Sequence, residues 1–171
     1  QGRTSANFSS GVFATSSGRF FFVATDSSGQ QLWSSDGTPA GTSSRTTGLC
    51  SSVDEILGVT DDTVFFSATA AVGTSGEELW ATDGTDAGTR LVRDLMGGSS
   101  NPRSGLILGS KLIFTAGDNQ SPEPWVSDGT SANTIRLMSS PSPIASLDGT
   151  AVGNTAFIHV TGSQMMRTSG T

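Results

Sequence analysis

The 171 residues can bury one sizeable core, but 22 glycines, abundant serine and threonine and no tyrosine favour short strands and tight turns over long helices. The net charge of −6 argues against nucleic acid and anionic membrane surfaces as partners, since both are recognised by basic faces. No apolar run reaches the roughly 18 residues of a membrane span, and the first ten residues lack the apolar segment of a signal peptide.

Taken in chain order, four kinds of short segment recur, which we call A, B, C and D. A is a short apolar run, B is apolar and rich in aromatics, C carries a tryptophan, and D is a polar, alternating run. The first repeat contains GVFAT from Gly11, RFFFVAT from Arg19, QLWSSDGTPAGT from Gln31 and GTSSRTT from Gly41. The second contains EILGVT from Glu55, TVFFSAT from Thr63, ELWATDGTDAGT from Glu78 and GTRLVRDL from Gly88. The third contains GLILGS from Gly105, KLIFTAG from Lys111, EPWVSDGTSANT from Glu123 and NTIRLMS from Asn133. The fourth contains GTAVGN from Gly149, TAFIHV from Thr155 and QMMRTSGT from Gln164.

The glycines of the D-G-T triplets, Gly37, Gly84, Gly129 and Gly170 (which the fourth copy has as S-G-T), recur every forty-odd residues, a period typical of repeated supersecondary units. Four short antiparallel strands in each unit predict an all-β fold, a β-propeller-like array of about four four-stranded repeats. An open solenoid of hairpins is the alternative. Because D occurs only three times, we favour an arc of a larger propeller over a closed four-bladed ring. We treat 1–171 as a single repeat domain, with repeats at about 17–60, 61–109 and 110–153 and partial repeats at 1–16 and 154–171.

The segments LWSSDGTPAGT, ELWATDGTDAGTRLVRDL and EPWVSDGTSANT resemble the ELWxxDGTxAGT tandem repeat of large secreted or surface proteins, mostly bacterial. The resemblance covers almost the whole chain and implies a propeller-like fold with adhesive or scaffold roles. It implies no activity. The fourth copy departs from the pattern, with Met166 in place of tryptophan and Ser169 in place of aspartate, and Asn133 replaces the second glycine of the third copy. By analogy, the motif is also similar to the structural hairpin turn called the Asp-box in sialidase propellers.

The residue types of the motif indicate a structural role, as a joint within the fold. Glycine after aspartate supplies the positive φ of a tight turn, while aspartate and threonine hydrogen-bond within it. We expect each tryptophan to pack between neighbouring blades and to donate its indole N–H. The residues predicted to form this repeated structural motif are Trp33, Asp36, Gly37, Thr38, Trp80, Asp83, Gly84, Thr85, Trp125, Asp128, Gly129 and Thr130.

The competing hypothesis is a ring of ligand sites. Asp36, Asp83 and Asp128 are weak calcium candidates, because each turn offers a single carboxylate where an EF-hand loop offers several. The tryptophans could instead stack on sugar rings. We expect no other cofactor.

Catalysis has little support in the sequence. His159, the only histidine, falls in a predicted inner strand, there is no G-x-S-x-G elbow, and one His and one Cys are too few for zinc. Cys50 is the only cysteine, so no internal disulfide can form. We expect it to be an unreactive, partly buried thiol. The acidic residues that could serve a glycosidase are Asp61, Asp62, Glu77, Glu78, Asp94 and Asp118. The adjacent pairs among them, Asp61–Asp62 and Glu77–Glu78, are expected to be solvated surface groups. Three D-segment arginines, Arg90, Arg93 and Arg136, are expected to protect an exposed sheet edge.

These observations predict a non-catalytic interaction or scaffold module of a secreted, cell-surface or filamentous assembly. Its partners would be other protein subunits or further repeats of the same chain, with no nucleic acid and no membrane insertion. Its binding surface would lie in the loops whose length varies between copies: DSSGQ from Asp26, AAVGTSGE from Ala70 and GDNQSPE from Gly117. The alternatives are a glycan-binding lectin, which requires a tryptophan or phenylalanine standing free on a face, and part of a propeller hydrolase, which requires acids converging from several blades.

Overall fold

The computed structural model describes residues 11–73, 76–118, 121–137, 147–152, 155–160 and 164–169. Every regular element in these ranges is a β-strand, as the composition predicts. None of the described residues forms a helix that is long and apolar enough to cross a membrane.

Fifteen strands form four antiparallel sheets, which we call blades 1 to 4. Blade 1 contains β1 (Phe13–Ala14), β2 (Phe20–Asp26), β3 (Gly29–Ser35) and β4 (Ser43–Ser44). Blade 2 contains β5 (Cys50–Val59), β6 (Val64–Ala70), β7 (Glu77–Thr82) and β8 (Arg90–Arg93). Blade 3 contains β9 (Arg103–Leu108), β10 (Lys111–Ala116), β11 (Glu123–Ser127) and β12 (Ile135–Arg136). Blade 4 contains β13 (Asp148–Val152), β14 (Thr155–Val160) and β15 (Gln164–Ser169).

Within each blade the strands lie in chain order, so the A, B, C and D segments become neighbouring antiparallel strands. The predicted four-strand unit is thus confirmed in blades 1 to 3. Each blade begins at its A strand, one strand earlier than the repeat bounds drawn from the sequence. The A strand of blade 2 is longer than its apolar run, because β5 already starts at Cys50 and keeps its pairing with β6 through three register shifts.

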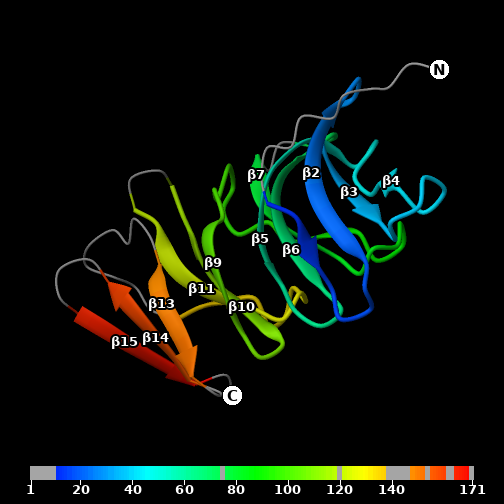
Figure 1. Ribbon diagram of the computed structural model, residues 1–171. Helices are drawn as coiled ribbons and strands as arrows, with labels where there is room; N and C mark the ends of the chain where they lie inside the picture. Colours follow the sequence, from blue (N-terminus) through cyan, green and yellow to red (C-terminus); the bar gives the residue numbers. More distant parts are fainter. Residues whose placement is uncertain are drawn as a thin grey trace.

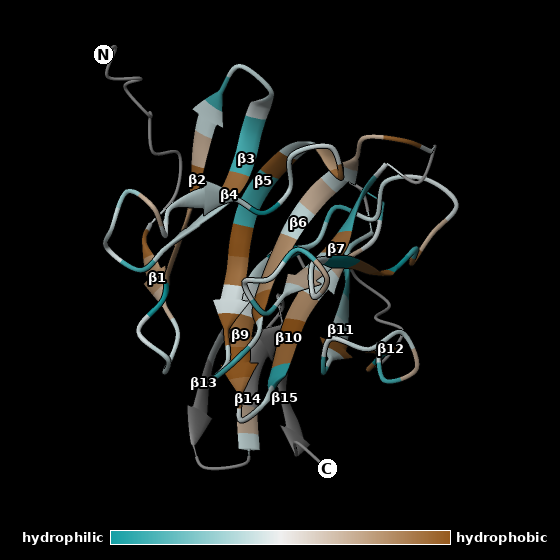
Figure 2. Ribbon diagram, turned by 90° about the vertical axis from the view of Figure 1, so that its right-hand side faces the viewer, coloured by the Kyte–Doolittle hydropathy of each residue, from teal (hydrophilic) through white to brown (hydrophobic). Residues whose placement is uncertain are grey.

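The blades follow one another in an open arc, with blade 1 at one end and blade 4 at the other (Figure 1). Apolar residues concentrate in the middle of the strands, as the brown segments of Figure 2 show. They form a cluster at each junction between consecutive blades. The B strands supply most of the fully buried large side chains, including Phe21, Phe65, Phe66 and Phe114, because each B strand lies between two neighbouring sheets.

Candidate functional site

The D-G-T turn of blade 2 is closed by its own side chains. Asp83 Oδ1 accepts hydrogen bonds from the Thr85 amide at 2.8 Å and the Thr85 hydroxyl at 2.7 Å, and Thr85 Oγ1 accepts one from the Gly88 amide at 2.9 Å. The same bonds join Asp36 to Thr38 and Asp128 to Thr130. The carboxylate therefore binds a backbone amide and a hydroxyl that the turn itself presents.

A second set of bonds ties each turn to strands C and D. The hydroxyls of Thr82 and Thr89 lie 2.7 Å apart, the Gly84 amide donates to Thr82 Oγ1, and the Thr89 hydroxyl donates to the Thr85 carbonyl. The corresponding hydroxyl pairs are Ser35–Thr42 at 2.6 Å and Ser127–Thr134 at 2.8 Å. Sequence reasoning missed this pair. The sequence does carry a signal for this pair: a serine or threonine stands directly before each aspartate, and a threonine follows seven positions after that hydroxyl residue.

The second glycine of the motif makes room for the carboxylate. A β-carbon built on Gly41 would overlap the carboxylate of Asp36, and one on Gly88 would overlap that of Asp83. Blade 3 has Asn133 at this position, where its Nδ2 donates to Asp128 Oδ2 at 2.6 Å. In blade 3, Asn133 therefore makes an additional hydrogen bond to the carboxylate for which the glycine of the other blades only makes room.

The hydrogen bonds also set the charge state of the three aspartates. The Thr38 hydroxyl and amide lower the pKa of Asp36 below its ordinary value of 3.8, and the Thr85 hydroxyl and amide do the same to the pKa of Asp83. Burial acts to raise the pKa of Asp128, but bonds from Thr130 and Asn133 outweigh it and leave that pKa lowered too. Across the described residues, no three acidic, histidine or cysteine side chains come close enough to hold a metal ion.

The turns of blades 2 and 3 are also held by the preceding blade. Gly84 is buried beneath Phe21 and Arg19 of blade 1, and Gly129 is buried beneath Phe65 and Arg90 of blade 2. A side chain on either glycine would meet these neighbours, and both glycines have φ of +86°. The turn is thus a contact between blades as well as a hairpin.

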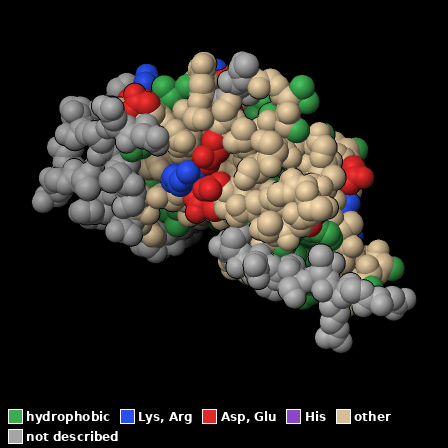
Figure 3. Space-filling view, turned by 90° about the horizontal axis from the view of Figure 1, so that it is seen from above, with side chains coloured by type: hydrophobic (Ala, Val, Ile, Leu, Met, Phe, Trp, Pro, Cys, Tyr) green, Lys and Arg blue, Asp and Glu red, His purple; other side chains and the backbone are tan. Residues whose placement is uncertain are grey.

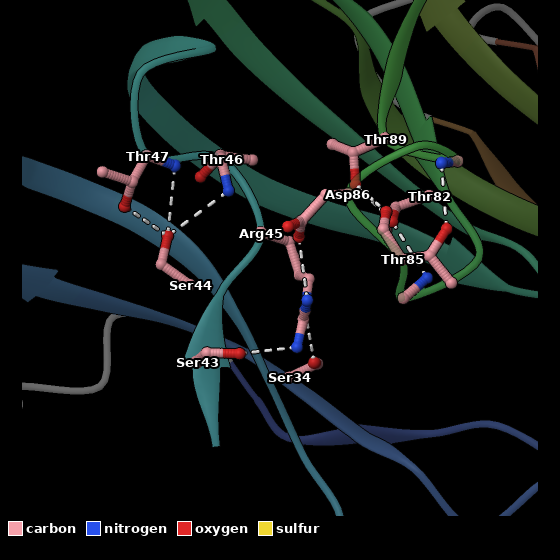
Figure 4. Close-up of polar contacts among 12 residues, drawn as sticks. Ser34, Ser43, Ser44, Arg45, Thr46, Thr47, Thr82, Thr85, Asp86 and Thr89 are labelled. Atoms are coloured by element: carbon pink, nitrogen blue, oxygen red, sulfur yellow. Dashed lines mark hydrogen bonds and ion pairs between the residues drawn. The ribbon is translucent and has the colours of Figure 1, made fainter. Parts of the chain in front are cut away.

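Arginines of one blade reach the turn of the next. Arg45 Nη1 lies 2.9 Å from Asp86 Oδ1, and the Arg45 side chain also donates to Ser34 and Ser43 of its own blade, as Figure 4 shows. Arg90 donates to the Gly129 carbonyl at 2.8 Å and Arg93 to the Thr134 carbonyl at 3.0 Å.

The expected edge-protecting role is therefore wrong for Arg90 and Arg93, whose head groups bind the neighbouring blade. The edge of β8 faces the turn of blade 3, which offers carbonyl acceptors. Arg136 differs from both, because its guanidinium pairs with Glu123 of its own blade at 2.6 Å.

Two of the three tryptophans also pack at a junction between blades, and Trp33 is the exception. Trp80 is 6% exposed and belongs to the cluster between blades 1 and 2, where its ring centroid lies 6.3 Å from that of Phe66. Trp125 packs against the cluster between blades 2 and 3. Trp33 is half-buried and belongs to none of the three clusters. The expected indole hydrogen bond forms at Trp125, which donates to the Ala116 carbonyl at 3.2 Å. The buried indole nitrogens of Trp33 and Trp80 have no partner among the described residues.

In blades 1 and 2 the residue two positions before the tryptophan secures the segment that leaves the blade. Glu78 is 0% exposed and accepts hydrogen bonds from the Leu95 amide and from the amide and hydroxyl of Ser100. Burial raises its pKa to about 7 despite these bonds. In blade 1 the equivalent Gln31, also buried, bonds Thr46 and the Cys50 carbonyl.

The expectation that Glu78 is a solvated surface group is therefore wrong. Glu78 lies inside β7, where its side chain points toward the 94–101 segment instead of solvent. Glu77 is partly buried and pairs with Arg103, so it is not a freely solvated group either.

Acidic and basic side chains gather in one patch near the middle of the face drawn in Figure 3. Arg103 on β9 binds Glu77 on β7 and lies 3.3 Å from Asp54 on β5. Burial raises the pKa of the neighbouring Glu55, while Arg103 acts in the opposite direction. This cluster brings acids from two inner strands together, yet its charges are paired with one arginine.

The other sequence candidates lie outside this cluster. Asp61, Asp62 and Asp128 line a polar hollow of about 380 Å³ together with Thr60, Thr63 and Ser110. Asp94 is exposed, and Asp118 accepts a hydrogen bond from the Ser121 amide. Cys50 is buried and free, and burial raises its pKa to about 12. His159 falls on β14, but its side chain and those of Met166 and Ser169 lie outside the described residues, as does Gly170.

Neither a protein-family profile nor a curated protein sequence matches the chain. Its fold matches that of solved structures, among them the following three. TolB from Acinetobacter baumannii aligns over 92% of this chain and 40% of its own, with 17% identity and a TM-score of 0.54. A chain of a nidogen–laminin complex aligns over 92% of this chain and 73% of its own, with 14% identity and a TM-score of 0.53. A puromycin hydrolase aligns over 95% of this chain and 30% of its own, with 13% identity and a TM-score of 0.61.

These structures are β-propeller proteins, so the chain has a β-propeller-like fold. It spans well under half the length of TolB and of the puromycin hydrolase. At such low identity the likeness concerns the fold alone. The neighbours include a chain of a protein complex and a hydrolase, so the fold by itself does not select between these roles.

Proposed function

We propose that the chain is a non-catalytic interaction and scaffold module of a secreted, cell-surface or filamentous assembly, built from repeats of the ELWxxDGT type. One observation carries this proposal: the repeated polar groups are used inside the fold. In all three described turns the aspartate and threonine bind one another, and in two of them a preceding blade covers the glycine. Because the polar groups of the motif already bond one another within the fold, they support a structural role for the motif. Recognition would then depend on the loops that vary between copies.

One of the three loops whose length varies between copies, the one that begins at Ala70, lies at one end of blade 2. The loop after β6 and the segments before β5 and after β8 all leave the sheet at that end, and the Ala71 amide donates to the Leu49 carbonyl at 2.8 Å. Three exposed apolar side chains stand on these segments: Leu49, Val72 (84% exposed) and Met96. We call this surface the loop face. Exposed apolar groups with charged neighbours are typical of a protein-binding surface.

The alternatives have less support from the described residues. A lectin would present a free aromatic ring. Trp80 and Trp125 are packed between blades and Trp33 is half-buried, which leaves Phe20, 42% exposed, as the exposed aromatic side chain among the described residues. A hydrolase would need two acids free to act on a substrate, but Glu77 is paired with Arg103 and Glu78 is bonded to Ser100. In the hollow that Asp61, Asp62 and Asp128 line, the Asp128 carboxylate is already bonded to the side chains of its own turn. The nidogen–laminin neighbour is a protein complex by its own description, which agrees with a protein partner for this chain.

The test is affinity isolation of partners from the source organism with the 171-residue chain and two variants. Val72→Asp/Met96→Asp changes the loop face, and Ile135→Asp, at another exposed apolar position on β12, is the matched control. We expect one protein to be retained by the wild type and the control, to be lost with the loop-face variant, and to bind again when purified. Equal retention by the wild type and both variants, or saturable binding of a glycan in place of a protein, would contradict the proposal.

A further inference from the structure

The position two residues before the tryptophan differs in chemistry between the three blades that carry one. It is occupied by Gln31 in blade 1, Glu78 in blade 2 and Glu123 in blade 3. Gln31 and Glu78 are both 0% exposed. The Glu123 side chain is 23% exposed and pairs with Arg136 at 2.6 Å. Blade 2 is therefore the one of the three in which this position is both fully buried and titratable.

The hydrogen bonds that the Glu78 carboxyl group makes within the described residues all go to the 94–101 segment, which links β8 to β9. Oε2 of Glu78 accepts bonds from the Leu95 amide at 3.1 Å and from the Ser100 hydroxyl at 2.6 Å, and Oε1 accepts one from the Ser100 amide at 3.2 Å. Met96, an exposed side chain of the loop face, stands between these two anchored residues. One buried carboxyl group therefore holds the segment on both sides of Met96.

No cation is paired with this buried carboxyl group in the part of the chain that the structure describes. The strand β6 carries no charged residue. The arginines of β8 and β9 all have other partners: Arg90, Arg93 and Arg103. Of the neighbouring acids, Glu77 is paired with Arg103, and Asp94 is exposed and acts against ionisation of Glu78. A carboxyl group buried without a cation is favoured in its neutral form.

The two ends of the segment depend on Glu78 to different degrees. Ser100 has further anchors, because its amide also bonds the Glu77 carbonyl and its own carbonyl accepts a bond from the next blade. Among the described hydrogen bonds, the one from the Leu95 amide to Glu78 alone joins residues 94–98 to another element. This stretch includes two successive glycines, and an added β-carbon on either would meet nothing within 4 Å. Loss of the bond to Glu78 would therefore free residues 94–98 and leave 99–101 attached.

We propose that Glu78 is a pH-operated latch, whose neutral carboxyl group holds residues 94–98 against blade 2 and whose ionised form releases them. The neutral group keeps the observed contacts, because the Ser100 hydroxyl can donate to a carboxyl oxygen or accept from one. Burial, with a smaller contribution from Asp94, raises the pKa of Glu78 from 4.5 to about 7. The closed state is therefore favoured most below about pH 4.5 and loses this advantage as the pH rises through about 7.

The latch acts on the loop face, because Met96 lies in the stretch that it holds. In mild acid Met96 would be presented from a fixed backbone, and above neutral pH from a loosened one. This consequence rests on the proposed function, since it concerns the surface assigned to partner binding. The latch itself is a property of the chain alone and can be tested without a partner.

Hydrogen exchange followed by mass spectrometry on the 171-residue chain tests the latch. Exchange of residues 94–98 is compared at pH 6 and pH 8 after correction for the intrinsic exchange rate. We expect opening to be about tenfold more frequent at pH 8, the ratio given by a pKa of about 7 in the closed state and 4.5 in the open state. The 45–50 segment is the internal control. It should show no such change, because it is held by Gln31, an amide that does not titrate.

Three variants complete the test. Glu78→Gln should remove the difference between pH 6 and pH 8, since blade 1 already has an amide at this position. Asp94→Asn, which removes the neighbouring like charge, and Glu123→Gln, which alters the exposed copy of the position in blade 3, should both keep it. If Glu78→Gln does not fold, the comparison of 94–98 with 45–50 in the wild type decides.

The inference would be overturned by equal exchange of 94–98 at both pH values in the wild type, or by the same pH response in 45–50. A response that survives Glu78→Gln, or one that is lost in Asp94→Asn, would overturn it as well. Because the measurement uses no partner, these outcomes leave the proposed function intact, and that function is tested separately by partner retention through Val72 and Met96.

Discussion

Arg90 on β8 donates a hydrogen bond to the Gly129 carbonyl at 2.8 Å, so an arginine of one blade holds the D-G-T turn of the next. Arg93 repeats this contact at the Thr134 carbonyl, and Arg45 reaches Asp86 from blade 1. The repeated motif therefore has two halves, a turn closed by its own aspartate and threonine and a cover supplied by the blade before it.

Replacing both arginines that hold the turn of blade 3 should loosen that junction. We expect Arg90→Ala/Arg93→Ala to lower the free energy of unfolding by about 2–4 kcal/mol, since hydrogen bonds to charged groups contribute about 1.5–3 kcal/mol each and these head groups are partly solvated. Urea denaturation measures the difference. Arg136→Ala is the control: its pair with Glu123 lies within one exposed blade edge and should contribute less than about 1 kcal/mol. Equal losses in the two variants would contradict the role assigned to Arg90 and Arg93.

The tryptophans should differ in their contribution to stability. Trp80→Ala should lower the free energy of unfolding by about 3–5 kcal/mol, as for other buried aromatic residues. Trp33→Ala should cost about half as much or less, because Trp33 is half-buried and no described blade packs on it. Chemical denaturation gives both values. A larger loss for Trp33 than for Trp80 would contradict this difference in burial.

The strand pattern could be predicted from the sequence because it is local. Alternating and apolar segments, a glycine after each aspartate and a forty-odd-residue period are properties of neighbouring residues, and they located the strands and the turns. The burial of Glu78 and the reach of Arg90 depend on how one sheet lies against the next segment or the next blade. Trp33 and Trp80 occupy the same place in the motif, but Trp80 belongs to the cluster between blades 1 and 2 whereas Trp33 belongs to none of the three clusters.

Glu78 should make stability depend on pH. Its pKa is raised from 4.5 to about 7 in the folded state, so protonation favours folding. The stabilisation from this group is fully present below about pH 4.5 and is lost as the pH rises through about 7, to an extent of at most about 3 kcal/mol. Thermal unfolding between these pH values should show a declining melting temperature in the wild type. Glu78→Gln should flatten this part of the profile, since Gln31 occupies the same position in blade 1 and the Ser100 amide also bonds the Glu77 carbonyl at 2.9 Å. An unchanged slope in Glu78→Gln would assign the effect to another group.

Cys50 should be unreactive in the folded protein. The thiol is 3% exposed and burial raises its pKa to about 12, so little thiolate is present near neutral pH. A chromogenic disulfide reagent at pH 8 should react slowly with the native chain and rapidly in urea. Fast, complete reaction without denaturant would show that the segment around β5 opens readily or that the thiol is accessible.

The central claim is that the D-G-T motif is a joint and not a ligand site, and one variant tests it directly. Asp83→Ala removes the acceptor of two hydrogen bonds inside the turn while leaving the loop face untouched. The decisive measurement is the free energy of unfolding of Asp83→Ala by urea denaturation, with binding of the isolated partner recorded on the folded fraction. The account predicts a loss of about 1–3 kcal/mol with unchanged partner affinity. Unchanged stability together with lost binding would contradict it, because the aspartate would then serve a ligand and not the fold.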